Sequence, residues 1–209
     1  MMEYKNIIFD IDGTMLDSYK IYMNANKIAI KEVLNYELTI KEQEDLFHLT
    51  NLQIQKKVGC TDEEFKEICN RADEIILQSN VPLFKGILDI IKKLKNDKYF
   101  LAINTSRTME EINSEKALEF IDNYFDFVVT SDKVKKPKPD REPTLLIIEN
   151  NKLNKSQTIM IGDSVSDSLS AHNAGIKFAL AGWGAIDKSV ACDYYLSSVE
   201  EILNIIKRA

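Results

Sequence analysis

The sequence predicts an α/β fold, a Rossmann-like parallel sheet with helices on both faces, plus a small α-helical domain inserted after the first strand. In the C-terminal two-thirds of the chain, short β-type apolar runs alternate with amphipathic segments, as in a parallel sheet covered by helices. Roughly 90 residues separate the first expected strand from the second, whereas a parallel crossover needs only about a dozen. This interval has helical periodicity, which indicates an insertion.

The elements of the core follow one another at regular spacing. Strands are expected at 4–9, 99–103, 127–130, 158–161 and 177–180, and helices near 87–95, 109–119, 141–150, 165–174 and 198–207. Thr108 with Glu111, and Ser197 with Glu200, fit capping boxes at the starts of two of these helices. Gly175 stands where a glycine commonly ends a helix.

Two apolar stripes at helical spacing occupy the insertion, and they comprise Ile21, Ala25, Ile28, Ala29 and Val33, then Phe65, Ile68, Ala72, Ile75 and Ile76. Thr39 with Glu42, and Thr61 with Glu64, supply two further capping boxes. The sequence therefore predicts an α/β core made of residues 1–17 and 83–209, and a helical subdomain at 18–82.

Composition excludes several classes of protein. The net charge is 27 − 33 = −6, and the chain has no block of five like charges. Nonspecific binding of nucleic acid is therefore not expected. The longest aliphatic run, 145–148, is far below the roughly 18 apolar residues of a membrane span, and Asp10 interrupts the first apolar stretch before a signal peptide could form. Three cysteines without a CxxC pair fit a reducing compartment, so a cytoplasmic protein is expected.

Acidic residues follow two of the expected strands. Asp10, Asp12 and Gly13 come directly after the first strand, and Asp163 and Asp167 come after the fourth. Ligands of a parallel sheet bind outside the carboxyl ends of its strands, so these acids are expected to converge. Two carboxylates about 4 Å apart repel by about 4 kcal/mol at an effective dielectric near 20, and a divalent cation would offset that repulsion. Oxygen ligands without nearby His or Cys favour Mg²⁺.

Phosphate-binding groups follow the other two strands. Thr105 and Ser106 come after the second strand, and Lys136 lies soon after the third, in the run Lys-Lys-Pro-Lys-Pro. Hydroxyl groups, an ammonium and backbone amides are what a bound phosphate needs.

The order of these groups resembles the haloacid dehalogenase superfamily, and within it the phosphoglycolate-phosphatase-like hydrolases with a helical cap. The segment from Asp10 to Ser18 is similar to the family's first motif, D-x-D-G-T-L-x-D-S. Thr105 matches the second motif, Lys136 the third, and the run from Gly162 to Asp167 the fourth. The sequence departs from the pattern at Met15, at Asn104 and at Arg107, where lysine is common.

The resemblance implies a mechanism. Asp10 is the expected nucleophile, and Asp12 is the expected acid and then base, a role that needs Asp12 protonated at the first step. Thr105, Ser106, Lys136 and Gly13 are expected to bind the transferred phosphate. Asp10, Asp12 through its backbone carbonyl, Asp163 and Asp167 are expected to hold Mg²⁺. The expected partner is a small phosphorylated metabolite.

Alternatives remain at the level of the sequence. A sugar phosphomutase shares these motifs, whereas a dehalogenase lacks the second acid and the metal. A phospho-receiver module also combines acids, Mg²⁺, a hydroxyl and a lysine, but it lacks an insertion, and a non-catalytic scaffold need not keep every catalytic position filled. Phosphoglycolate, nucleotides and sugar phosphates all remain possible substrates, and the chain could be a monomer or a dimer.

Overall fold

A computed structural model describes residues 4–47 and 51–207. The chain divides into two compact units, one formed by Met1–Asp17 with Pro82–Ala209 and the other by Ser18–Val81. The chain therefore passes between them twice, after Asp17 and after Val81.

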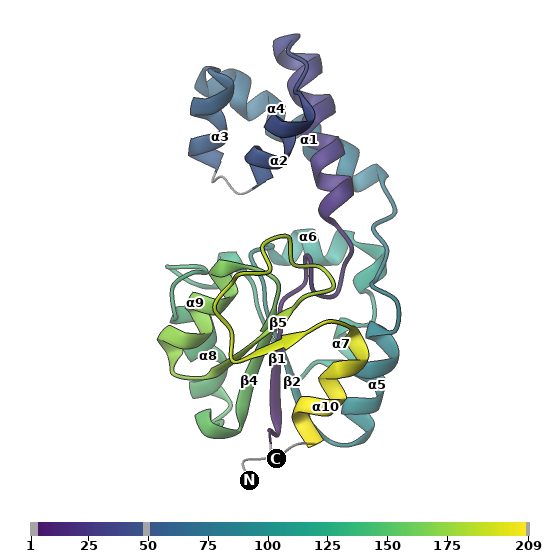
Figure 1. Cartoon of the computed structure of the whole chain (residues 1–209), viewed down its shortest axis with the longest axis vertical. Helices are drawn as coiled ribbons and strands as arrows, with labels where there is room; N and C mark the ends of the chain where they lie inside the picture. The colour runs from purple at the N-terminus through teal and green to yellow at the C-terminus, as the bar shows by residue number, and fades with distance from the viewer. Residues whose placement is uncertain (1–3, 48–50, 208–209) are drawn as a thin grey trace. The chain divides into compact units, whose positions relative to one another are not determined.

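A six-stranded sheet forms the centre of the larger unit, and every pair of neighbouring strands in it is parallel (Figure 1). Its order is β3-β2-β1-β4-β5-β6, with bounds β1 Asn6–Phe9, β2 Phe100–Asn104, β3 Phe127–Val129, β4 Thr158–Gly162, β5 Lys177–Ala181 and β6 Tyr194–Leu196. The α/β fold class and the five expected strands are confirmed. The edge strand β6 was not predicted, because it has three residues and only Leu196 among them is buried, which leaves no apolar run in the sequence.

Helices cover both faces of this sheet, with α8 and α9 on one side and α5, α7 and α10 on the other (Figure 1). Their bounds are α5 Ile87–Asn96, α6 Met109–Ser114, α7 Ile121–Tyr124, α8 Glu142–Asn150, α9 Val165–Ala174 and α10 Ile202–Lys207. The β strands pack between them through side chains that are fully buried, such as Ile8, Met160 and Phe178. This packing makes the sheet a rigid support for whatever follows its strands.

Among its described residues, the smaller unit has four helices: α1 Tyr19–Leu34, α2 Ile40–Phe47, α3 Asn51–Val58 and α4 Asp62–Gln78. The two apolar stripes meet where α1 packs against α4, and they bury Ala25, Ala29, Ile68 and Ala72. The two predicted capping boxes are present, since Thr39 and Thr61 each exchange hydrogen bonds with the glutamate three residues later.

Helix ends in the larger unit follow the sequence with two exceptions. The capping box of Thr108 is present, and Gly175 ends α9 with a φ of 81°. Ser197 does not cap through Glu200, because a 3₁₀ turn at Val199–Glu201 opens the last helix and brings Glu201 to Ser197 instead. The helix expected at 109–119 ends at Ser114 and is followed by a second 3₁₀ turn. Within the described ranges, no helix has the length and apolarity that crossing a membrane requires.

Candidate active site

The site lies at the carboxyl ends of three adjacent strands. Asp10 follows β1, Thr105 follows β2 and Asp163 follows β4. In the sheet register, Phe9 at the end of β1 pairs with Ile103 in β2 and Ile161 in β4. The side chains after these strands therefore emerge next to one another although they are up to 153 residues apart in the chain, from Asp10 to Asp163 (163 − 10).

Three carboxylates meet at this edge. One oxygen each of Asp10, Asp163 and Asp167 lies within 4.8 Å of the others. Asp10 is 5% exposed, Asp167 is fully buried, and Asp163 is partly buried. Gly13 makes room for the cluster: its φ is 71°, and a β-carbon there would overlap the carboxylate of Asp163. Convergence of the first and fourth motifs on one point is what the sequence predicted.

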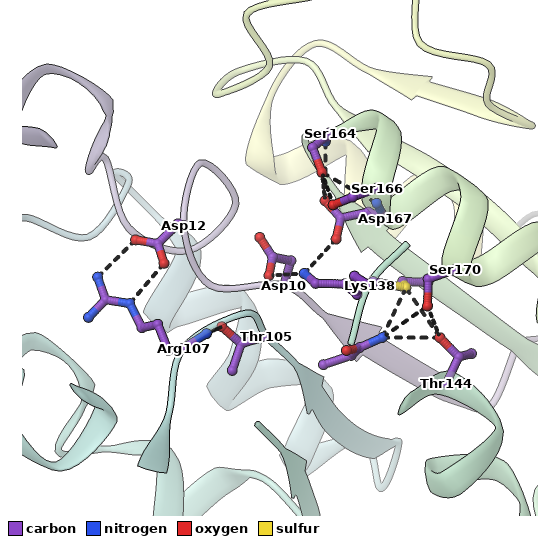
Figure 2. Close-up of polar contacts among 12 residues, drawn as sticks. Asp10, Asp12, Thr105, Arg107, Lys138, Thr144, Ser164, Ser166, Asp167 and Ser170 are labelled. Atoms are coloured by element: carbon purple, nitrogen blue, oxygen red, sulfur yellow. Dashed lines mark hydrogen bonds and ion pairs between the residues drawn. The ribbon is translucent and has the colours of Figure 1, made fainter. Parts of the chain in front are cut away.

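The ammonium of Lys138 lies between two of these acids. Its Nζ donates to Oδ1 of Asp10 at 2.5 Å and to Oδ1 of Asp167 at 2.6 Å, and the side chain is only 3% exposed (Figure 2). Burial opposes the charge of Lys138, but the two carboxylates outweigh it and raise the pKa of the lysine. Lys138 is therefore a fixed cation beside the nucleophile candidate.

Lys136, the lysine expected at this position, is elsewhere. It is exposed, and its backbone N–H donates to Glu142 at 3.1 Å. The placement of Lys136 in the site is therefore corrected to Lys138. Lys136 and Lys138 each precede a proline, so a Lys-Pro dipeptide does not show which lysine enters the site. In the structure the side chain after Pro137, that of Lys138, contacts Asp10.

A buried polar network anchors the loop that carries Lys138. The Ser170 hydroxyl donates to the carbonyl of Asp140 at 2.8 Å and is 2.9 Å from the Thr144 hydroxyl. The amide of Asn104 donates to Thr144 at 3.1 Å, and all three side chains are fully buried. Figure 2 shows Thr144 and Ser170 of this network side by side. Asn104, a departure from the family pattern, thus has hydrogen-bond partners that the sequence did not reveal.

Asp167 has a second partner in the start of helix α9. Its Oδ2 accepts hydrogen bonds from the backbone N–H of Ser164 at 3.1 Å and from the Ser164 hydroxyl at 2.6 Å, which is a capping box. Because its Oδ1 holds Lys138, both oxygens of Asp167 already have partners. This arrangement fits a residue that fixes Lys138 more closely than one that binds a cation directly.

Asp12 points away from the cluster and is held by Arg107. The guanidinium donates from Nε and Nη2 to the two carboxylate oxygens, each at 2.8 Å, and Arg107 is 8% exposed (Figure 2). Two parallel N–H···O bonds from one guanidinium fix the orientation of the carboxylate. The side chain of Asp12 is not part of the three-carboxylate cluster. The sequence shows Arg107 only as a departure from the lysine that is common there, and it does not predict the contact with Asp12.

Thr105 and Ser106 differ in exposure. Thr105 is 3% exposed and its hydroxyl accepts from the backbone N–H of Arg107 at 3.2 Å, whereas Ser106 is exposed. The backbone of Thr105 is bonded to Val129 of the neighbouring strand at 3.0 Å. The second-strand loop is thus fixed at Thr105 and at Arg107, and Ser106 projects between them.

Burial shifts the protonation of the acids toward the neutral form. Burial, opposed by Lys138 and assisted by the neighbouring acids, raises the pKa of Asp10 from its ordinary 3.8 to about 7. Burial and the charges of Asp167 and Asp10 also hold the pKa of Asp163 well above its ordinary range. The cluster is therefore short of positive charge even with Lys138 in place.

This donor set fits a magnesium ion. Asp10 and Asp163 offer carboxylate oxygens, which hard divalent cations prefer, and Asp163 is partly accessible. No histidine or cysteine belongs to the cluster within the described residues, which disfavours zinc. An added 2+ charge would favour the ionised form of these carboxylates, which burial disfavours.

We therefore expect Mg²⁺ to stabilise the protein, and to do so increasingly as the pH rises. A folded-state pKa above the unfolded value favours the protonated acid, so the stability that Asp10 contributes is full below about pH 4 and is lost as the pH rises toward 7. A cation removes that loss. At 100 times its dissociation constant it adds about 2.7 kcal/mol, or about 5–10 °C in Tm for a chain of this size.

Thermal unfolding with Mg²⁺ and with EDTA, at matched pH between 5 and 8, measures this difference. Asp163→Asn should remove most of the Mg²⁺ shift, while Asp122→Asn, at an exposed position outside the motifs, should keep it. Equal melting temperatures with and without Mg²⁺ at pH 8 would contradict the expectation.

The chain is similar to known proteins over most of its length. Residues 7–181 match the family model described as haloacid dehalogenase-like hydrolase. Pyrophosphatase PpaX of Bacillus velezensis is 27% identical over 212 residues, covering 95% of this chain and 94% of that protein. Pyrophosphatase PpaX of Halalkalibacterium halodurans is 26% identical and covers 98% of each chain.

Solved structures share the fold over nearly the whole chain. A candidate phosphoglycolate phosphatase from Lactobacillus plantarum superposes with a TM-score of 0.85 at 24% identity, covering 98% of this chain and 100% of that one. CbbY from Rhodobacter sphaeroides, solved with phosphate, gives a TM-score of 0.78 at 19% identity and covers 97% and 96%. At these identities the likeness establishes the fold alone.

Proposed function

Because the chain belongs to the haloacid dehalogenase-like hydrolase family, we propose that it is a Mg²⁺-dependent phosphatase that hydrolyses a small phosphomonoester through an aspartyl-phosphate. The observation that carries this proposal is the buried carboxylate of Asp10 at the tip of β1, bonded to Lys138 and next to Asp163. A nucleophile, a fixed cation and a second acid on adjacent strands are the parts that phosphoryl transfer needs.

In the first step, an oxygen of Asp10 forms a bond to phosphorus while the bond from phosphorus to the leaving-group oxygen breaks. Asp12 gives that oxygen a proton, and for this its carboxyl must leave at least one of its two bonds to Arg107. In the second step, Asp12 takes a proton from a water molecule, whose oxygen forms a bond to phosphorus while the bond from phosphorus to Asp10 breaks. This releases inorganic phosphate and restores Asp10.

Other side chains stabilise charge on the transferred group. Lys138 contacts Asp10, and its positive charge would stabilise the negative charge that develops on the phosphoryl oxygens. The hydroxyls of Thr105 and Ser106 would donate to those oxygens. The N–H of Gly13 already donates to the carbonyl of Leu16 at 2.9 Å, so Gly13 would contribute by letting the backbone approach the phosphate. Asp10 and Asp163, with the backbone carbonyl of Asp12, would hold Mg²⁺, which would supply positive charge against the charges of the carboxylates and the phosphate. Asp167 would support the site by holding Lys138.

We assign the chemistry to residues 1–17 and 83–209 and a substrate-covering role to 18–82. The net charge of −6 and the absence of long basic runs favour a small phosphorylated metabolite over nucleic acid or a membrane surface as partner. The three cysteines are free, which supports action in the reducing cytoplasm. The chain would act as a monomer or a dimer.

Inorganic pyrophosphate is a second candidate substrate. Relatives that match this chain over nearly its full length are named pyrophosphatase PpaX. The same groups would transfer a phosphoryl group from an anhydride, and the leaving phosphate needs less help from an acid than an alkoxide does. A phosphomutase would use the same first step but return the phosphoryl group to a sugar.

A panel of phosphate compounds with and without Mg²⁺ tests the proposal. We expect release of inorganic phosphate from p-nitrophenyl phosphate and from at least one of phosphoglycolate, nucleoside monophosphates, sugar phosphates and pyrophosphate, and loss of that release with EDTA. Transfer between positions of a sugar without phosphate release would instead indicate a mutase. No Mg²⁺-dependent turnover of any compound would contradict the proposal.

A further inference from the structure

We propose that three buried polar side chains, those of Asn104, Thr144 and Ser170, are positioning residues that set the placement of Lys138 beside the nucleophile. This inference rests on the proposed function, since it concerns how the same site stabilises the transferred phosphoryl group. It gives these side chains more than a structural role, because it assigns to them an effect on the rate of the chemical step.

Helix α9 contacts the lysine segment at two points. Oδ1 of Asp167 accepts from Nζ of Lys138 at 2.6 Å, and the hydroxyl of Ser170 donates to the backbone carbonyl of Asp140 at 2.8 Å (Figure 2). Asp167 and Ser170 are three residues apart in α9, so they lie on one face of that helix. One helix thus holds both the charged end of Lys138 and the backbone two residues after it.

The backbone between these two points is stiff. Pro137 and Pro139 flank Lys138, and each proline ring locks its own φ and restricts the residue before it. A displacement of the anchored carbonyl at Asp140 would therefore pass to Lys138, because the backbone between them has little freedom to absorb it. The hydrogen bond from Ser170 thereby controls the position from which the side chain of Lys138 extends.

Two other elements hold the hydroxyl of Ser170. It is 2.9 Å from the hydroxyl of Thr144 in α8, and Nδ2 of Asn104, the last residue of β2, donates to Thr144 at 3.1 Å and to Ser170 at 3.5 Å. All three side chains are fully buried, so solvent does not compete for these hydrogen bonds. Strand β2 pairs with β1, which ends just before Asp10. The network therefore joins the loop of Lys138 to the strand beside the nucleophile.

Core packing alone does not account for Asn104. Its Oδ1 is buried, and among the residues that the structure describes it has no hydrogen-bond partner. An acceptor in that state lowers stability, so an apolar side chain of similar size would serve a purely structural purpose better. The amide adds donors, and these are bonded to Thr144 and Ser170. Asparagine at this position is therefore explained by what its N–H groups hold.

The reaction itself makes this network more important. In the resting site Nζ of Lys138 contacts the carboxylates of Asp10 and Asp167. When an oxygen of Asp10 forms its bond to phosphorus, the carboxylate loses its charge and attracts the ammonium less. Lys138 then stays beside the phosphoryl oxygens only through Asp167 and through the position of its own backbone.

A second buried pair in the same protein supplies matched control variants. Asn6 donates to Thr158 at 3.0 Å, and Thr158 is fully buried like Thr144, but this pair lies at the first residues of β1 and β4, at the opposite end of the sheet. Thr158→Val and Asn6→Ala therefore remove the same chemical groups as Thr144→Val and Asn104→Ala without touching the loop of Lys138.

Steady-state kinetics with p-nitrophenyl phosphate in Mg²⁺ test the inference. We expect Asn104→Ala, Thr144→Val and Ser170→Ala to lower kcat about 10- to 100-fold, the range of a small misplacement of a catalytic group, with KM changed by less than about 3-fold. The two control variants should keep kcat within about 3-fold, although they also lose a buried hydrogen bond. Thr144→Ser restores the hydroxyl and should recover most of the loss in kcat.

Acylation by acetic anhydride locates Lys138 without turnover. Peptide mass spectrometry gives the extent of reaction at Lys138 relative to that at the exposed Lys136, at a temperature where circular dichroism shows every variant folded. Lys138 is 3% exposed, so it should react slowly in the wild-type protein and in the two controls. In the three network variants it should react about 10-fold faster or more, because a loop with fewer anchors opens more often.

Equal losses of kcat in network and control variants would overturn the inference, and so would unchanged kcat in all three network variants or a change in KM alone. Failure of the proposed function looks different, because the wild-type protein would then release no phosphate. Acylation would still decide in that case: equal reactivity of Lys138 in network and control variants would overturn the positioning role.

Discussion

Replacement of Asp10 by asparagine is expected to lower turnover by about 10⁴-fold or more in a protein that remains folded. Asparagine keeps the size of the side chain but cannot supply a carboxylate oxygen to phosphorus. Lys138 retains Asp167 as a partner in this variant, so the loop that carries it should stay in place. Phosphate release from p-nitrophenyl phosphate in saturating Mg²⁺ measures the loss.

The matched control is Asp122→Asn, an exposed acid in α7 outside all four motifs. It should retain turnover within about a factor of 2, since exposed substitutions rarely disturb a fold. Turnover of Asp10→Asn near the wild-type level would assign the nucleophile to another residue.

Replacement of Lys138 by methionine is expected to lower kcat by about 10²–10³-fold, which is the effect of removing one group that stabilises developing charge. The same substitution at Lys136, two residues earlier, should change kcat by less than about 3-fold, because that side chain is exposed and its backbone alone is bonded. The comparison of these two variants directly tests the correction that the structure makes to the sequence motif.

Lys138→Met also leaves two buried carboxylates without their cation, a change that can cost about 3–5 kcal/mol of stability. Kinetics should therefore be measured in Mg²⁺ at a temperature where circular dichroism shows the variant folded. A larger loss in Lys136→Met than in Lys138→Met would contradict the assignment.

Much of this site could be predicted because its parts stand at the ends of strands. Buried parallel strands have near-continuous apolar runs, so their ends at Asp10, Thr105 and Asp163 were visible in the sequence. The topology of a parallel sheet then brings those ends to one edge. For these residues, local pattern and global fold agree.

Pairing between side chains could not be predicted in the same way. Which lysine enters the site depends on the conformation of the loop that carries them. A hydrogen bond from Ser170 to Asp140 holds that loop, and these residues are 30 positions apart in the chain. The contact of Arg107 with Asp12 joins residues that are 95 positions apart, so no helical or strand periodicity relates them. Such contacts are set by tertiary packing, which leaves no local signal in the chain.

The most direct test of the account is a rapid acid quench of the protein during turnover of a ³²P-labelled substrate in Mg²⁺, followed by reduction with borohydride and peptide mass spectrometry. The account predicts labelled protein whose label is lost in hydroxylamine, conversion of residue 10 to homoserine by the reduction, and neither signal in Asp10→Asn. Full turnover with no label on the protein, or with the label on a different residue, would contradict it.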